Sequence, residues 1–431
     1  MHAICQAGSH SQKTMIFRFL IVLSIIVLVD LYFFQSLKTI TATWSESKRV
    51  LAGRIYWGVT LAGAIFVLFN IITYKNPVIN RTVGLYIFCF YMILFISKLI
   101  GSLPLMFEDI GRGVKWIVAF FNKGTDLPAV KGGMSRGKFI SYTALTLAAI
   151  PFGTMIYGMV KTAFDFKIQR KKIPIAKLPA AFEGLKIVQI SDIHSGSFIS
   201  DAHFKNAVEM IMNEKPDLIF FTGDLVNDRS DEAEPYKNVW KNLSAPLGVF
   251  SVLGNHDYGD YVLWDTPELK QANLERLFGI HKEMGWDLLR NEHRIIEKNG
   301  EKIGLVGVEN WGAALRFPRK GDMKKAQLGM DDVPVKILLS HDPSHWEAKI
   351  LKEHPEIDLT LSGHTHGFQF GIEIPGFKWS PSQYVYPQWA GHYSNGNQHL
   401  YVNRGLGFLG YLGRVGIRPE ISVLELTASV V

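Results

Sequence analysis

The sequence predicts an α/β domain preceded by an all-α transmembrane domain of about four helices. Four long apolar stretches lie before residue 178, short β-branched runs alternate with helical patterns after it, and the charge changes sign at the same place. Residues 1–180 contain 21 Lys and Arg against 6 Asp and Glu, whereas the remainder contains 25 against 33. We therefore divide the chain into a multi-pass transmembrane domain with a basic linker, residues 1–177, and a second domain, residues 178–431.

The apolar stretches are residues 19–34, 55–74, 82–97 and 139–160. A bilayer core needs about 20 apolar residues per helix, so the second and fourth stretches suffice alone and the others need flanking apolar residues. The alternatives are a buried soluble helix or, for the first stretch, a signal peptide. The lack of a small-residue cleavage site argues against a signal peptide. Met15 is a second candidate start of the protein. Asp30 stands alone in the first stretch and Lys98 closes the third, so no paired intramembrane charges indicate a transporter.

Charge excludes one class of partner and leaves orientation open. The net charge of +7 suggests nucleic acid, but the basic surplus lies among apolar segments and the second domain is acidic, so no nucleic-acid binding is expected. Basic residues flanking the helices number ten on the side of the second domain and eleven on the other, a near tie. We favour a cytoplasmic second domain because the dense basic run at residues 167–172 would bind anionic head groups; a solvated linker is the alternative. Cys5 and Cys89 predict neither a disulfide nor a Cys-based metal site.

The second domain shows a repeated strand and helix pattern. Residues 185–190, 218–221, 248–253, 335–339 and 359–361 are predicted strands, and residues 203–213 have helical spacing. Asp192 precedes Asp224 by 32 residues and Asp224 precedes Asn255 by 31, which is the length of a strand, a crossover helix and a parallel strand. Adjacent strand ends would bring these side chains together. Later strands near residues 399–403 and 421–426 would finish a second sheet, and residues 265–284 are predicted to form an inserted, partly helical cap beside the site.

Polar residues with metal-ligand chemistry follow these strands. They are Asp192 and His194, Gly223 and Asp224, the run Gly254-Asn255-His256-Asp257, His341, and the run Gly363-His364-Thr365-His366-Gly367. Two divalent cations need one shared carboxylate plus terminal oxygen and imidazole ligands, and Asp224 suits the shared position because Gly223 permits a tight turn. This mixed set favours Mn²⁺, with Zn²⁺ or Fe as alternatives, over an all-oxygen Mg²⁺ or Ca²⁺ site. The pattern predicts a two-metal hydrolytic site.

The order of these motifs resembles the calcineurin-like metallophosphoesterases over residues 178–426. Two further passages, Asn403-Arg-Gly-Leu-Gly407 and Arg418-Pro-Glu-Ile421, resemble the membrane-associated bacterial branch grouped with UDP-2,3-diacylglucosamine hydrolase-like enzymes. The resemblance implies a four-layer αββα sandwich. It also implies a first metal bound by Asp192, His194, Asp224 and His366, and a second bound by Asp224, Asn255, His341 and His364.

The same resemblance makes His256 the catalytic imidazole, which stabilises the phosphoryl oxygen or protonates the leaving group, with Asp257 fixing its tautomer. The chain departs from many relatives at Asn227, where they have Asp, which weakens any role for this position. We expect Asp342 and His345 to support the ligands or cap a helix rather than bind metal. The remaining histidines are expected on the surface or in packed positions: His281, His293, His354, His392 and His399.

We hypothesise that metal-activated hydroxide attacks phosphorus directly, because no Ser, Cys or Asp stands in a nucleophile setting beside the ligands. A membrane domain favours a phosphodiester or pyrophosphate in a lipid or lipid-linked substrate, with residues 377–389 and 406–412 as an apolar lip, although such aromatic residues commonly serve in packing. The alternatives are a soluble phosphoester or a non-catalytic metal-binding appendage. The intact ligand set with His256 and Asp257 argues against the last.

Overall fold

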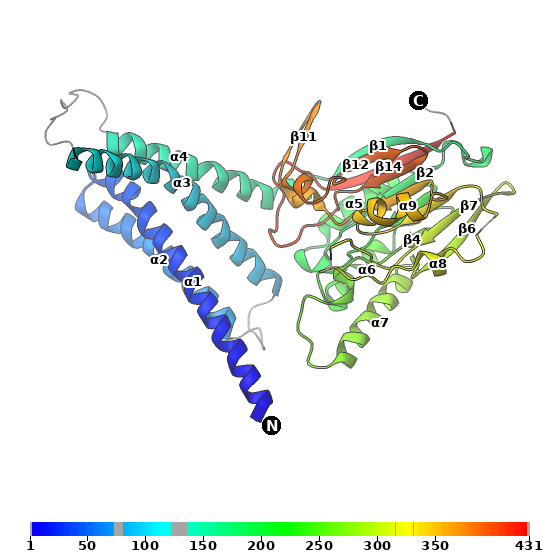
Figure 1. Ribbon diagram of the computed structural model, residues 1–431, viewed down its shortest axis with the longest axis horizontal. Coiled ribbons are helices and arrows are strands. Elements are labelled where there is room, and N and C mark those ends of the chain that lie inside the picture. The colour runs from blue at the N-terminus through cyan, green and yellow to red at the C-terminus, as the bar shows by residue number, and fades with distance from the viewer. Residues whose placement is uncertain (1, 73–80, 122–135, 315, 331, 429–431) are drawn as a thin grey trace. The chain divides into compact units, whose positions relative to one another are not determined.

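The computed structural model describes residues 2–72, 81–121, 136–314, 316–330 and 332–428 (Figure 1). The chain forms two compact units, Met1–Ile156 and Tyr157–Val431. Among the described residues, the first unit consists of the helices α1 (His2–Thr41), α2 (Glu46–Ile72), α3 (Arg81–Phe121) and α4 (Arg136–Val160), the last of which ends in the second unit. All four are long and apolar enough to cross a membrane, which confirms the predicted transmembrane domain. Residues 73 and 74 of the second predicted stretch lie outside the described residues.

Two charged residues of the first unit differ from prediction. Lys98 does not close the third stretch, because α3 continues through Pro104 to Phe121. Asp30 does not stand alone, since Lys98 Nζ forms a buried ion pair with Asp30 Oδ1 and Tyr56 Oη donates to the same oxygen at 3.0 Å. An apolar interior penalises an unpaired charge, but the partners lie on α1, α2 and α3, and sequence distance does not reveal which helices meet. The argument against a transporter from unpaired charge is therefore wrong.

The second unit is built from two six-stranded sheets among its described residues. The first sheet has the order β1 (Lys167–Pro174), β14 (Glu420–Thr427), β2 (Lys186–Ile190), β3 (Leu218–Phe221), β4 (Val249–Ser251) and β5 (Asp287–Leu288). The second has the order β12 (Gly391–Asn395), β13 (Gln398–Val402), β9 (Leu359–Ser362), β8 (Lys336–Leu339), β7 (Glu301–Gly307) and β6 (Glu292–Lys298). The short central strands are mostly apolar because both faces of each sheet are buried.

Strand β8 shows how the layers form. Ile337 and Leu339 join Leu218 of the first sheet in the core between the sheets, while Leu338 packs on the opposite face with Trp346 of the helical segment that follows. Successive side chains of a strand alternate between faces, so one strand supplies two cores. On the outer face of the first sheet lie the crossover helices α5 (Ala202–Asn213) and α7 (Pro267–Glu283), and outside the second sheet lie α8 (Met323–Ala326) and α9 (Leu351–Glu353). The predicted four-layer αββα sandwich is confirmed.

Three predicted elements are placed differently. Strand β14 lies between β1 and β2, so residues 421–426 complete the first sheet and not the second. The basic residues 167–172 belong to β1, an edge strand paired in parallel with β14, and not to a linker. Helix α7 connects the parallel strands β4 and β5 as an ordinary crossover and is not an inserted cap. Each error concerns which distant segment a strand or helix packs on, which local patterns do not encode.

Candidate metal centre

The candidate ligands follow the carboxyl ends of five strands. Asp192 and His194 follow β2, Asp224 follows β3, Asn255 follows β4, His341 follows β8, and His364 and His366 follow β9. The first three strands are neighbours in the first sheet and the last two are neighbours in the second. Loops at the same end of neighbouring parallel strands converge, so the site is assembled from both sheets.

Five of these residues have a strained backbone. Asp192, His194, Asp224, His364 and His366 all have φ between +49° and +72°, and they make up half of the ten described non-glycine residues with positive φ. This left-handed conformation is unfavourable for residues with a Cβ atom, so its concentration here indicates a functional site. Gly223 has φ +100°, and a Cβ there would lie 2.5 Å from the Gly254 nitrogen. The predicted tight turn before Asp224 is therefore confirmed.

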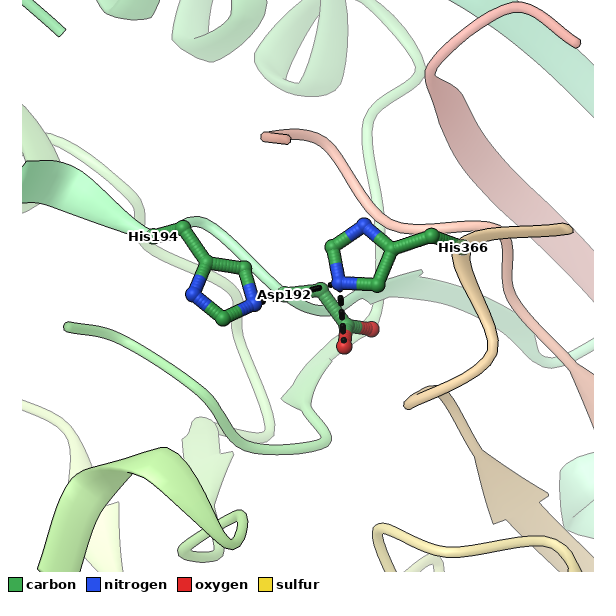
Figure 2. Close-up of side chains that lie close together, drawn as sticks. All are labelled: Asp192, His194 and His366. Carbon is green, nitrogen blue, oxygen red and sulfur yellow. Dashed lines mark hydrogen bonds and ion pairs between the residues drawn. The ribbon is translucent and has the colours of Figure 1, made fainter. Parts of the chain in front are cut away.

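The first cluster contains Asp192 and His194 of the loop after β2 and His366 of the loop after β9, and their side chains point toward one another (Figure 2). The Nε2 atoms of His194 and His366 are 3.1 Å apart, and His366 Nε2 lies 3.2 Å from Asp192 Oδ1. Ligand atoms bound tetrahedrally at 2.0–2.1 Å from a zinc-like ion are about 3.3 Å from one another. All three residues are buried, and the spacing of their nitrogen and oxygen atoms fits one shared cation.

The second cluster contains Asp224, His341 and His364. His341 Nε2 lies 3.1 Å from Asp224 Oδ2 and 3.2 Å from His364 Nδ1. Asp224 Oδ2 is also 3.6 Å from His194 Nε2 of the first cluster, so this carboxylate lies between the two groups. Asn255 Oδ1 is buried without a hydrogen-bond partner among the described residues, which leaves a carbonyl oxygen available to a cation. The residues present fit two divalent metal ions.

Neighbouring oxygens set the orientation of three imidazoles. His194 Nδ1 pairs with Asn227 Oδ1 at 3.1 Å, and His341 Nδ1 pairs with the Thr222 carbonyl at 2.7 Å. A carbonyl oxygen only accepts, so each Nδ1 carries the proton and each Nε2 offers a lone pair to its cluster. His364 is reversed, because its Nε2 bonds Tyr386 Oη at 2.8 Å.

Two of these supporting residues were undervalued from sequence. Asn227 lies three residues after Asp224, a position to which we assigned no role because it departs from the family pattern. Tyr386 was expected among packing aromatics, and no signal in the sequence distinguishes it. Both form hydrogen bonds with histidines of the two clusters, through side chains that approach only in the folded chain.

The electrostatics of the clusters suit ligands. Burial lowers the pKa of His194 and that of His364, which keeps both imidazoles neutral. Burial also opposes a charge on His341, but the Asp224 carboxylate outweighs it and raises the pKa of His341 to about 10. Burial of Asp224 favours protonation of its carboxylate, but the charge of His341 outweighs burial and holds the pKa of Asp224 well below its usual range. A divalent cation held by His341 and Asp224 would replace this proton and would neutralise the Asp224 carboxylate.

The role predicted for Asp257 is wrong. His256 Nδ1 pairs with the Asn227 carbonyl at 2.7 Å, so that carbonyl fixes the tautomer. The Asp257 carboxylate instead accepts from four backbone amides, those of Asp224, Leu225, Val226 and Gly254. A buried carboxylate is stabilised by such amides, and here they hold the loop that carries Asp224. Asp257 therefore shapes the site and does not orient His256.

The clusters open into a pocket of about 500 Å³. Its wall combines polar residues, which are Asp224, Asn255, His256, Arg316, His364, Thr365 and His366, with the less polar Tyr261, Phe317, Phe368, Val385, Tyr386 and Leu409. Of the predicted lip at residues 406–412, Leu409 lines the pocket, whereas Leu406, Phe408 and Leu412 are fully buried. Trp389 packs in a small core with Ile417, as the packing alternative expected.

The other polar candidates lie outside both clusters, as predicted. Asp342 Oδ1 accepts from the Ser344 amide at 2.8 Å, and its Oδ2 lies 3.7 Å from His364 Nε2. His345 Nδ1 pairs with Ser340 Oγ at 2.9 Å. The remaining histidines make local contacts: His281 with Ser251, His293 with Ala326, His354 with Glu356, and His392 with His399.

Comparison with known proteins agrees with this geometry. The family model for "Calcineurin-like phosphoesterase" matches residues 185–368, and that for "Probable Calcineurin-like phosphoesterase, transmembrane domain" matches residues 15–163. The uncharacterized metallophosphoesterase YkuE of Bacillus subtilis is 31% identical over 69% of this chain and 99% of that protein. The chain belongs to the calcineurin-like phosphoesterase family. It is thus a metal-dependent phosphoester hydrolase with a membrane domain.

Other phosphoesterases of the family are similar over comparable parts of the chain. The UDP-2,3-diacylglucosamine pyrophosphatase LpxG of Chlamydia muridarum is 29% identical over 63% of this chain and 92% of that protein. A transmembrane protein with metallophosphoesterase domain from Danio rerio is 31% identical to this chain. The aligned region covers 63% of this chain and 60% of that protein. The family uses divalent metals, in keeping with the two clusters.

Proposed function

We propose that this phosphoesterase binds two divalent cations, with Mn²⁺ favoured over Zn²⁺ and Fe, and hydrolyses a phosphodiester or pyrophosphate bond in a lipid or lipid-linked substrate. The observation that carries the proposal is the position of Asp224 between two ligand clusters at one pocket. The first cation would be held by Asp192, His194, Asp224 and His366, and the second by Asp224, Asn255, His341 and His364. Bound cations of this kind acidify water and neutralise charge on the phosphoryl oxygens.

His256 supplies proton transfer in this proposal. Its Nδ1 donates to the Asn227 carbonyl, so Nε2 is the atom that exchanges protons at the pocket. In its protonated form, Nε2 donates to the oxygen of the leaving group. Arg316 lines the same pocket and offers a cation to the substrate phosphate.

Water is the nucleophile that the pocket leaves available. Thr365 is the aliphatic hydroxyl among the described lining residues, and its Oγ1 already donates to the Trp389 carbonyl at 2.7 Å. The Asp224 carboxylate lies against His194 and His341 of the two clusters, so it is not free to attack phosphorus. We therefore expect no phosphorylated enzyme during turnover.

The choice of a lipidic substrate rests on the apolar half of the pocket and on the membrane domain. Phe317, Phe368, Val385 and Leu409 line the pocket beside the polar residues. Such a wall accommodates an acyl or isoprenoid group next to a phosphate. One relative, LpxG, is by name a UDP-2,3-diacylglucosamine pyrophosphatase. We further propose a multi-pass cell-membrane protein with its catalytic unit in the cytoplasm, where the exposed Arg170, Lys171 and Lys172 would meet anionic lipids.

The test uses the purified full chain with Mn²⁺, assayed on a lipid-linked pyrophosphate and on bis(p-nitrophenyl) phosphate. Hydrolysis of the lipid-linked substrate, abolished by Asp224→Ala and retained by the exposed control Asp265→Ala, supports the proposal. Hydrolysis of the soluble ester alone supports a soluble substrate. Metal binding without hydrolysis of either substrate supports a non-catalytic domain. Trapping of a covalent phosphoprotein would refute direct attack by water.

A further inference from the structure

A short hairpin of the catalytic unit has one apolar and one charged face. It consists of β10 (Ile372–Ile374) and β11 (Phe377–Trp379) and stands out from the two sheets (Figure 1). Ile372 lies opposite Trp379, Ile374 opposite Phe377, and Glu373 opposite Lys378. Residues paired across two strands share a face, and neighbours along a strand alternate. The apolar face is thus Ile372, Ile374, Phe377 and Trp379, and the charged face is Glu373 and Lys378.

The two faces are arranged oppositely to those of a soluble hairpin. The charged face is bound to the protein, because Glu373 Oε1 pairs with Arg404 Nη2 at 2.9 Å and Lys378 Nζ donates to the Ala390 carbonyl at 2.6 Å. The apolar face is turned outward, with Ile372 49%, Ile374 58% and Phe377 52% exposed. Soluble domains normally bury the apolar face of a hairpin. A contiguous exposed apolar surface of this kind indicates a binding surface.

The base of the hairpin is tied to the metal centre. Ser380 Oγ donates to the carbonyl of Gly367, the residue after the ligand His366, at 2.7 Å. Phe368 and Val385 are each about half exposed and line the pocket. Exposed apolar side chains thus lie both on the hairpin and at the pocket, in segments that the Ser380–Gly367 hydrogen bond joins.

We propose that the hairpin seats its apolar face in the membrane interface and directs the mouth of the pocket toward the lipid surface. The catalytic unit starts at Tyr157 within α4, and the candidate membrane span Arg136–Phe164 ends three residues before β1. The Gly158 carbonyl in this last turn accepts from the Arg414 amide at 3.2 Å, so the end of the membrane helix is part of the unit. The catalytic unit is thereby tethered to the helix that enters the bilayer.

Charge and aromatic residues also favour lipid over a protein partner. The hairpin is held at Ala390, directly before the edge strand β12. Burial, and after it the charges of His399 and Lys171, lower the pKa of His392 in β12 to about 4, so Lys171 of the edge strand β1 lies near β12. Strand β1 exposes Arg170, Lys171 and Lys172. Basic groups beside exposed apolar and aromatic side chains are typical of surfaces that bind anionic lipid interfaces. The proposal deepens the proposed function, on which it rests for the lipid nature of the substrate.

The direct test places a fluorescent probe on the hairpin of the full chain. Ile374→Cys, in a background with Cys5 and Cys89 replaced by Ala, carries an environment-sensitive dye, and the protein is reconstituted in phosphatidylcholine and phosphatidylglycerol vesicles containing bromine-labelled acyl chains. Glu297→Cys, on the exposed strand β6, is the matched control. We expect blue-shifted emission that brominated lipid quenches at position 374 and not at 297. Emission at 374 that brominated lipid does not quench, whether the dye faces water or protein, would overturn the proposal.

A kinetic test reads the same contact through substrate delivery. The double variant Ile374→Ser/Phe377→Ser is expected to lower the ratio of hydrolysis of vesicle-embedded substrate to hydrolysis of soluble ester by about tenfold, since membrane affinity scales with buried apolar area. Ile295→Ser, which removes an exposed apolar residue from β6, should leave the ratio unchanged. An unchanged ratio in the double variant contradicts the proposal. If the unsubstituted protein hydrolyses neither substrate, the proposed function fails while the quenching test still decides the hairpin.

Discussion

Replacement of Asp257 by Asn is expected to take apart the loop that carries Asp224. The Asp257 carboxylate accepts from the amides of Asp224 and Gly254 at 2.9 and 2.8 Å through Oδ2, and from Leu225 and Val226 at 2.8 and 3.3 Å through Oδ1. An Asn side chain keeps one acceptor and turns an NH₂ group toward the other two amides. Each buried amide that is left without an acceptor costs about 1–3 kcal/mol, so the loss of two hydrogen bonds lowers stability by about 2–6 kcal/mol. This is a large part of the free energy of unfolding of a typical domain.

The measurement combines denaturant unfolding of the purified full chain with its bound Mn²⁺ and its activity as a function of pH. We expect Asp257→Asn to lose stability and bound metal together, because the strained Asp224 backbone is no longer held. The control is Asp217→Asn, which lies away from the site. Its side chain accepts a single backbone hydrogen bond, from the Lys186 amide at 2.8 Å. An amide oxygen still accepts this bond, so the cost should stay below about 1 kcal/mol. If Asp257→Asn keeps its stability and its metal but shifts the pH profile, Asp257 acts through His256 and the structural reasoning is refuted.

Three further outcomes are expected. Tyr386→Phe should raise the Mn²⁺ concentration for half-maximal activity about tenfold, because the hydrogen bond to His364 Nε2 is lost. Tyr384→Phe, at an exposed position, should leave this concentration unchanged. Equal Mn²⁺ concentrations for half-maximal activity in the two variants would contradict the prediction. Burial lowers the pKa of His281 to about 3, below its unfolded value of about 6.5. The unfolded chain therefore binds the proton first, and the free energy of unfolding falls as pH drops below 6.5, by about 2 kcal/mol at pH 5. Unfolding of His281→Gln should lack this pH-dependent component, and an equal pH slope in both proteins would contradict the assignment to His281. In the membrane domain, Asp30→Asn should lower the free energy of unfolding by about 3–5 kcal/mol, because Lys98 is left unpaired. The double variant Asp30→Asn/Lys98→Met should recover most of the lost melting temperature. Identical melting temperatures of the single and double variants would argue against a charge pair.

Much of the candidate site was predictable because its ligands lie at strand ends. Short apolar runs such as residues 218–221 form strands buried on both faces, and the first polar residues after them lie at the sheet edge. The residue types in those loops limit the chemistry to metal binding, and Gly223 marks a turn that a side chain would block. Local spacing therefore predicted the candidate ligands, and the family resemblance predicted their division between two metals. The sequence also determined the four apolar helices, whose length alone suits a bilayer.

The contacts between those elements followed from the tertiary structure alone. Asn227 and Tyr386 bond histidines of the two clusters from loops that no local pattern connects. Asp257 accepts from backbone amides of a neighbouring loop and does not pair with the adjacent His256. Strand β14 enters the first sheet, and the outward apolar face of the β10 and β11 hairpin depends on which side the charged pair binds. Periodicity and residue type act over a few residues and fix local structure. Partners, orientation and proton positions depend on contacts between segments far apart in the chain, which only the folded arrangement decides.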